Sequence, residues 1–366
     1  MKKVLFIAPY RQTDEWGEKS RILVAMLQQL CDLTIRPIWF NSEVNPNMSL
    51  GLMEQLENKN EQEFDILIQF GLPSHFAYDG RFKKNIAITS FDCVHKNIDV
   101  SSVLSLFDKV AVFSSTEIEH AFRSGIPNNK IVNFGCDPFV LPSYPDTNFD
   151  FGVEGITFYT MAGLSPDSGL RETLAAYLSI PRDEFKSTLA VVTNNPEEVK
   201  KQIQATQEIL GICAPTEYRK IAICNPTSTK DSRHYKNQAH LAFDVFVNVG
   251  YNASQCQDTL LAYSADNRVI SPRSNNFYKK YTDRVKTIEE ICLHPNKPLP
   301  YMFTGNTTWH MPIIRDLQET MKRIMKAKHK TFSGLMGVDQ SDKGRLRLNG
   351  CLENFKKQLE DLLCTQ

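Results

Sequence analysis

The sequence predicts an α/β protein made of two successive doubly wound halves, and three observations lead to this prediction. The chain has 366 residues, which is more than one hydrophobic core usually organises. Short apolar runs, such as residues 3–8 and 66–70, alternate with amphipathic segments, such as residues 20–30. The alternation stops at residues 141–155, which are rich in Pro, Asp, Asn and Gly, and then resumes. We therefore expect a linker between two similar halves.

The first half carries strands that are apolar throughout, which is typical of parallel strands covered on both faces. We expect strands at residues 3–8, 33–39, 66–70, 85–89, 109–113 and 131–134. We expect helices between them at residues 20–30, 53–60, 103–107 and 116–124.

The second half repeats the pattern and ends in helices. We expect strands at residues 156–161, 187–193, 220–225, 244–249 and 269–270. We expect helices at residues 169–178, 197–210, 254–263, 312–328 and 352–363, and a polar loop before Asp244. These elements predict an N-terminal domain at 1–145, a C-terminal domain at 146–335, and a tail at 336–366 whose helix packs back on the first domain.

Composition narrows the class of protein. The formal net charge is zero, so a polyanionic partner would need a local basic patch. Nine cysteines form no Cys-x-x-Cys pair and no zinc spacing, which favours reduced thiols in a cytoplasmic protein. No segment approaches the ~20 apolar residues of a membrane-spanning helix, and residues 1–10 fit a first strand better than a signal peptide.

The stretch from residue 243 to 272 carries the strongest signal for a ligand site. A buried strand ends at a small polar turn, residues 250–253, and a helix follows. The first N–H groups of a helix lie at the positive end of its dipole and suit a diphosphate. The alternative is an ordinary strand–helix unit that holds nothing. Polar groups for donor binding would come from Tyr251, Asn252, Ser254, Gln255 and, for a ribose hydroxyl, Asp258.

Several strings resemble GT-B glycosyltransferases, in particular retaining family-4-like enzymes and phage glycosyltransferases. Residues 8–21, Ala-Pro-Tyr-Arg-Gln through Trp-Gly to Ser-Arg, resemble the family's phosphate-approaching loop after the first strand. Residues 110–126 and 131–137 resemble the end of its N-terminal domain, and residues 164–170 resemble the start of its C-terminal domain. Residues 309–312, Trp-His-Met-Pro, fit the segment before its last helices. The resemblance implies two Rossmann-like domains facing a cleft and a nucleotide-sugar donor.

The chain departs from this family at the donor phosphates. The positions of the family's Arg and Lys read Gly163 and Ser168, and those of its two glutamates read Ala253 and Leu261. Cations at the leaving diphosphate supply a large share of the rate in such reactions. Other cations would have to replace them, and the candidates are Arg11, Arg21, Lys230, Arg233, His234 and Arg273. Of these, Arg21, Lys230 and Arg233 are the predicted donor-binding residues.

Candidate catalytic residues follow the expected strand at 85–89. Asp92 matches an Asp that lies after the same strand in phage DNA α-glucosyltransferases, and His95 follows it. A carboxylate or imidazole there would orient the acceptor hydroxyl or stabilise an oxocarbenium-like centre. The alternatives are a turn cap for Asp92 and a local hydrogen bond for His95. Gly17 would let the backbone approach phosphate, or it simply forms a turn.

These features predict a glycosyltransferase that moves a hexosyl or pentosyl group to an acceptor hydroxyl. No Asp-x-Asp motif occurs, so we expect metal-independent chemistry with no cofactor besides the donor co-substrate. The resemblance implies retention and makes a hydroxymethylated base in double-stranded phage DNA one acceptor, with host cytoplasm as the location; a glycan or protein is the other. Basic segments such as residues 81–84 would serve DNA. The alternatives are a non-catalytic nucleotide-sugar binder and a GT-B sugar-nucleotide epimerase.

Overall fold

A computed structural model gives the fold. It describes residues 1–40, 51–60, 63–91, 93–95, 98–138, 151, 153, 155–161, 163–164, 168–181, 186–212, 219–225, 232–251, 257–265, 267–273, 282–292, 307–331 and 341–364.

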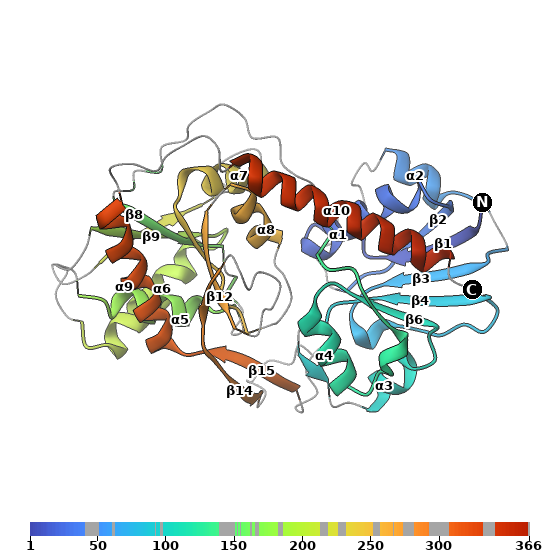
Figure 1. Cartoon of the computed structure of the whole chain (residues 1–366), viewed down its shortest axis with the longest axis horizontal. Coiled ribbons are helices and arrows are strands. Elements are labelled where there is room, and N and C mark those ends of the chain that lie inside the picture. Colours follow the sequence, from blue (N-terminus) through green and yellow to red (C-terminus); the bar gives the residue numbers. More distant parts are fainter. Residues whose placement is uncertain are drawn as a thin grey trace.

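The first half is a six-stranded parallel sheet in the order β2-β1-β3-β4-β6-β7 (Figure 1). Its strands are β1 (Lys3–Ala8), β2 (Asp32–Pro37), β3 (Ile66–Phe70), β4 (Lys84–Ile88), β6 (Lys109–Val112) and β7 (Ile131–Asn133). Its helices are α1 (Glu15–Leu27), α2 (Leu52–Glu57), α3 (Ile98–Leu104) and α4 (Ser115–Arg123), with short 3₁₀ turns η1 (Pro73–His75) and η2 (Asn128–Lys130).

The second half repeats this plan with a parallel sheet in the order β10-β9-β8-β11-β12-β13. Its strands are β8 (Ile156–Thr160), β9 (Ser187–Val192), β10 (Lys220–Cys224), β11 (Val245–Val247), β12 (Arg268–Pro272) and β13 (Thr282–Val285). Its helices are α5 (Leu170–Leu178), α6 (Pro196–Ile209), α7 (Ser232–Ala242), α8 (Gln257–Ser264) and α9 (Ile314–Thr331).

The central strands explain why these sequences form parallel sheets. All residues of β3, β8 and β11 are buried, as expected for strands with helices on both faces. The predicted fold class, two Rossmann-like α/β units with helices at the C-terminal end, is confirmed.

Some element boundaries differ from the sequence prediction. Helix α1 begins at Glu15 rather than at residue 20, because the Asp14 side chain caps it by accepting from the Gly17 N–H at 3.0 Å. The polar loop predicted before Asp244 contains helix α7, and the predicted helix at 254–263 is observed from Gln257 to Ser264. Residues 252–256 lie outside the described residues.

A third sheet, which the sequence did not predict, joins the two halves. Strand β15 (Thr307–Pro312) pairs antiparallel with β14 (Thr287–Cys292) on one side and with β5 (Val94–His95) on the other. Strand β5 belongs to the first half and follows β4, whereas the hairpin follows β13 of the second half. In Figure 1 this hairpin lies between the two halves, near α4.

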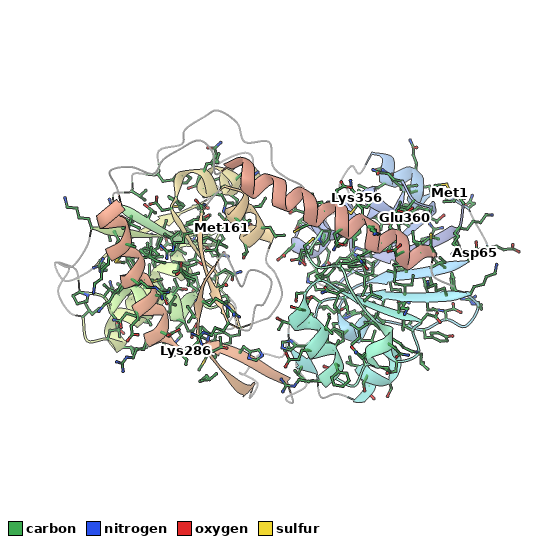
Figure 2. The ribbon with its side chains drawn as sticks, viewed as in Figure 1. Met1, Asp65, Met161, Lys286, Lys356 and Glu360 are labelled. Atoms are coloured by element: carbon green, nitrogen blue, oxygen red, sulfur yellow. The ribbon has the colours of Figure 1, made fainter. Side chains whose placement is uncertain are left out.

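The last helix, α10 (Ser341–Cys364), returns to the first half. Figure 1 shows it running from beside α7 to beside β1, and Figure 2 places Lys356 and Glu360 along it. Its apolar residues Phe355, Leu359, Leu362 and Leu363 belong to the core of the first sheet, and so does Leu260 of α8. The Phe355 ring lies 4.4 Å from that of Phe134. The first half therefore builds its core partly from residues far along the chain.

Candidate active site at the carboxyl edges of the sheets

The loop after β1 is held rigidly by α1. A Cβ atom on Gly17 would lie 1.9 Å from the carbonyl oxygen of Gln12, so glycine is required for this close approach. The Arg21 guanidinium donates from Nη1 to the carbonyls of Tyr10 at 2.9 Å and Gln12 at 2.8 Å. Both predicted donor-binding residues thus shape the loop, and their contact with phosphate stays a prediction.

The start of α4 closes the carboxyl ends of β4 and β6. The buried Glu117 carboxylate accepts from the N–H groups of Phe113 at 2.7 Å and Ser114 at 2.8 Å, and from the Ser90 hydroxyl. The Ser114 hydroxyl in turn accepts from the Glu117 N–H, which completes a capping box. The carboxylate therefore ties the loop after β4 to α4.

A buried ion pair lies beside this capping box. Lys19 of α1 is 3.3 Å from Asp137, which follows β7, and 3.0 Å from Glu15. The Asp137 side chain is almost completely buried, and the Lys19 ammonium faces its Oδ2. Burial raises the pKa of Asp137 well above its ordinary value, and Lys19 opposes the shift.

Two histidines link the two halves. His120 on α4 donates from Nδ1 to the Phe91 carbonyl at 2.8 Å, because a carbonyl oxygen only accepts. In the neutral ring, Nε2 is then an acceptor, and it lies 3.4 Å from Nε2 of His310 on β15. The two rings are nearly parallel, at 14°. Since this bond needs one lone pair, the pair carries at most one positive charge.

The turn after β11 packs on the first turn of α5. The Tyr251 hydroxyl donates to Oε1 of the buried Glu172 at 2.6 Å. The backbone carbonyl of Tyr251 accepts from the His310 N–H at 3.3 Å. Gly169, the N-cap of α5, has φ +74°, and a Cβ there would lie 2.4 Å from the Val249 carbonyl oxygen. Glycine is therefore needed where α5 meets this turn.

The remaining predicted donor-binding residues are placed as follows. Asp258 on α8 has Oδ1 4.0 Å from Nε2 of the buried His240 on α7. Arg233 lies in the first turn of α7, and nothing is described of its side chain. Lys230, Asn252, Ser254 and Gln255 lie outside the described residues, so their roles stay predictions.

The structure places the loop that carries the predicted catalytic residues at the junction of the halves. Asp92 lies outside the described residues, but its neighbour Phe91 accepts from His120. The backbone of His95 pairs with Thr307 of β15, and nothing is described of its side chain. Their catalytic roles stay predictions.

Sequence reasoning missed four residues that the structure brings to this region: Glu117, His120, Glu172 and His310. The capping pattern Ser-x-x-Glu at 114–117 was readable in the sequence. His310 lies within the Trp-His-Met-Pro string that entered the resemblance. Nothing local marks His120 or Glu172, because their partners come from other segments.

Comparison with known proteins supports the same fold. No family model matches the chain, and no curated protein matches it. Among solved structures, the chain is similar to Anabaena Alr3699/HepE in complex with UDP-glucose, with 10% identity over all of both chains and a TM-score of 0.63. It is also similar to sucrose-phosphate synthase from Thermosynechococcus elongatus, with 10% identity over 99% of this chain and 98% of that one and a TM-score of 0.61. A glycosyltransferase from Rickettsia africae gives 12% identity over 97% and 98%, with a TM-score of 0.56. Identities this low show the fold alone.

Within the described residues, no group of three or more His, Cys, Asp or Glu side chains could hold a metal ion. Among the helices that the structure describes, none is long and apolar enough to cross a membrane.

Proposed function

We propose that this chain is a glycosyltransferase that moves a sugar from a nucleotide-sugar donor to an acceptor hydroxyl. In this proposal residues 146–335 hold the donor and residues 1–145 hold the acceptor. The observation that carries it is a continuous path of contacts between the two predicted binding elements. It runs from Tyr251 through His310 and His120 to Phe91, so the donor turn and the loop of Asp92 lie on either side of one histidine pair.

The chemistry follows from these positions. Tyr251 and the predicted residues Asn252, Ser254 and Gln255 would present donors to the diphosphate at the start of α8, with Asp258 toward the ribose. Arg21, Lys230, Arg233 and the Gly17 loop would complete the donor site. Asp92 and His95 would face the reacting carbon from the acceptor side. The similarity to a fold solved with UDP-glucose supports the donor class.

Retention of configuration and independence from metal belong to the same proposal. The family-4-like strings support retention, and the lack of an Asp-x-Asp motif supports chemistry without a metal clamp. The product of a retaining transfer is an α-linkage from an α-linked donor. NMR of the product in buffer with and without a chelator tests both points.

A second candidate function is a nucleotide-sugar binder without turnover. The observation that favours it is the loss of the family's phosphate cations at Gly163 and Ser168. A Cβ on Gly163 would meet no atom of the described residues within 4 Å, so Gly163→Arg is the variant chosen to restore the family's cation. If the chain is an enzyme, Gly163→Arg should raise turnover about tenfold through one added charge at the leaving group.

The deciding experiment combines binding and turnover. Thermal-shift assays with a panel of nucleotide sugars identify the donor, and nucleotide release with a mixture of acceptors measures transfer. Asp92→Asn should lower kcat by about a hundredfold or more and spare donor binding. Asp79→Asn, a change in a half-buried carboxylate paired with the exposed Arg81, is the matched control and should leave both unchanged. Binding without release, in wild type and in Gly163→Arg alike, would establish the binder, and no binding of any nucleotide sugar would exclude both functions.

A further inference from the structure

A chain of polar side chains runs through the core of the second half. His240 near the end of α7 and Tyr159 of β8 are fully buried, and Asn267 comes just before β12. The Tyr159 hydroxyl lies 2.7 Å from Nδ1 of His240 and 2.6 Å from Nδ2 of Asn267. Nε2 of His240 lies 4.0 Å from Oδ1 of Asp258 on α8. We name these four residues the His240 network.

The hydrogen bonds of the His240 network have a fixed direction. Nδ2 of Asn267 also donates to the backbone carbonyl of His240 at 2.5 Å, and a carbonyl oxygen only accepts, so the amide nitrogen faces it. The Tyr159 hydroxyl therefore accepts from Asn267 and donates its one hydrogen to Nδ1 of His240. Because Nδ1 accepts, the ring proton of neutral His240 is on Nε2.

The network ends in a buried donor. Nε2 of His240 has no hydrogen-bond partner among the described residues, and leaving a buried N–H group unpaired costs stability. This nitrogen faces the Asp258 carboxylate at 4.0 Å, and a shift of about 1 Å would make the contact a hydrogen bond. The Asp258 side chain is 19% exposed, so it reaches from the buried ring to the surface.

Packing alone does not call for a histidine at this position. The centroid of the His240 ring lies 5.6 Å from that of Tyr159 and 5.6 Å from that of Phe246, contacts that a phenylalanine ring would also make. Only histidine combines an acceptor toward Tyr159 with a donor toward Asp258 on one ring. The imidazole is therefore explained by its two polar contacts, and the second of them leads to α8.

Asp258 lies in the first turn of α8, the element to which the proposed function assigns the donor nucleotide. Helices α7 and α8 pack against each other (Figure 1), which brings His240 to this turn. A freely rotating carboxylate at a helix N-terminus would repel a diphosphate bound there. An N–H donor on one carboxylate oxygen fixes where the other oxygen points, so that it can meet a hydroxyl rather than a phosphate.

We propose that His240 is a positioning residue for recognition of the donor nucleotide. Its Nε2–H holds one oxygen of Asp258, and the other oxygen accepts a hydrogen bond from a ribose hydroxyl. The imidazole does not touch the nucleotide and acts through Asp258. A carboxylate discriminates strongly for the hydroxyl that it binds, because charge-assisted hydrogen bonds are about twice as strong as neutral ones. This inference rests on the proposed function for the nucleotide, but it does not depend on turnover.

The test compares ribonucleotides with their deoxy forms. Isothermal titration is run with UDP, GDP, ADP and CDP, each beside its 2′-deoxy and 3′-deoxy counterparts. The wild type should bind at least one of the four about tenfold more tightly than one of its deoxy forms. Asp258→Asn should reduce this ribose ratio to about twofold and spare the affinity for the deoxy form. Asp258 is partly exposed, so this variant tests the inference even if a buried variant of His240 does not fold.

Two substitutions of His240 separate its two hydrogen bonds. His240→Asn keeps an acceptor near the position of Nδ1 for Tyr159 but has no donor that reaches Asp258. His240→Gln extends an amide N–H to the position of Nε2 but gives up the acceptor for Tyr159. His240→Asn should therefore lower the ribose ratio from about tenfold to about twofold, whereas His240→Gln should keep it above about fivefold. A purely structural histidine predicts the opposite order, because only His240→Asn preserves the bond to Tyr159.

The outcomes separate this inference from the proposed function. A ribose ratio that survives in Asp258→Asn, equal ratios in His240→Asn and His240→Gln, or equal weakening of ribo and deoxy forms in His240→Asn would overturn the role of His240. Binding of a nucleoside diphosphate without ribose discrimination would do the same and leave the proposed function standing. The expected ratios in a protein that transfers no sugar would sustain the inference and contradict the transferase. No binding of any nucleotide would overturn both.

Discussion

Two buried glutamates occupy the same position in two helices but differ in their hydrogen bonds. Glu117 and Glu172 are each the third residue of a helix at a carboxyl edge, in α4 of the first half and α5 of the second. Glu117 accepts three hydrogen bonds from its own surroundings. Glu172 accepts one, from Tyr251, and among the described residues its Oε2 has no hydrogen-bond partner.

The difference begins at the residue that precedes each helix. Ser114 caps α4 with its hydroxyl and sets up the reciprocal bond of Glu117. Gly169 has no side chain to cap α5, and its place against the Val249 carbonyl requires glycine. The first helix end is therefore closed by the chain itself. The second helix end keeps a buried carboxylate oxygen that has no hydrogen-bond partner among the described residues. In the proposed function a hydroxyl of the donor sugar would bind this oxygen.

The largest effect should come from removing the carboxylate of Glu117. Glu117→Ala leaves two N–H groups and the Ser90 hydroxyl without their acceptor, so the free energy of unfolding should fall by about 3 kcal/mol. Denaturant unfolding measures this loss. Glu119→Ala, an exposed change on the same helix, should stay within about 0.5 kcal/mol. An equal loss in both variants would contradict the role given to the capping box.

The carboxylate of Glu172 should contribute to nucleotide-sugar binding rather than to folding stability. Glu172→Gln should reduce nucleotide-sugar affinity about tenfold, which is about 1.4 kcal/mol, because an amide is a weaker acceptor than a carboxylate. Its free energy of unfolding should change by less than about 1 kcal/mol, since Tyr251 keeps an acceptor oxygen. Isothermal titration with the donor measures the first quantity, with Glu198→Gln on α6 as control. An unchanged affinity in Glu172→Gln would contradict the binding role given to Glu172 in contrast to Glu117.

The smallest effect concerns Asp137 and its dependence on pH. Burial raises the folded-state pKa of Asp137 above its ordinary 3.8. A group with a raised pKa contributes its stability below the unfolded-state pKa and loses it as pH rises through the folded-state pKa. Relative to Asp137→Asn, the wild type should therefore become progressively less stable as pH rises above 3.8.

Unfolding curves of both proteins from acidic to neutral pH measure this difference. Lys19 keeps Glu15 as a partner at 3.0 Å in the variant, so the comparison isolates the Asp137 carboxyl. A difference between the two proteins that stays constant with pH would show that the folded-state pKa is not raised.

The sequence allowed the two parallel sheets to be predicted, because buried parallel strands such as 66–70 are continuous apolar runs. The third sheet escaped prediction, because Thr-Thr-Trp-His-Met-Pro at 307–312 carries no strand periodicity. Its pairing of Thr308 with Val94 joins opposite halves of the chain. The expected position of the candidate site at the carboxyl edges rests on the same strands and stays a prediction. Glu172 did not, because its burial depends on Tyr251, which arrives from a distant turn.

The return of α10 to the first sheet has a consequence for how the chain is made. Phe355, Leu359, Leu362 and Leu363 complete the first core, yet they are synthesised long after the strands of the first sheet. During translation the apolar face that α10 covers stays exposed until residues 341–364 leave the ribosome. A nascent chain stalled before residue 350 therefore exposes an apolar surface of the kind that holding chaperones bind.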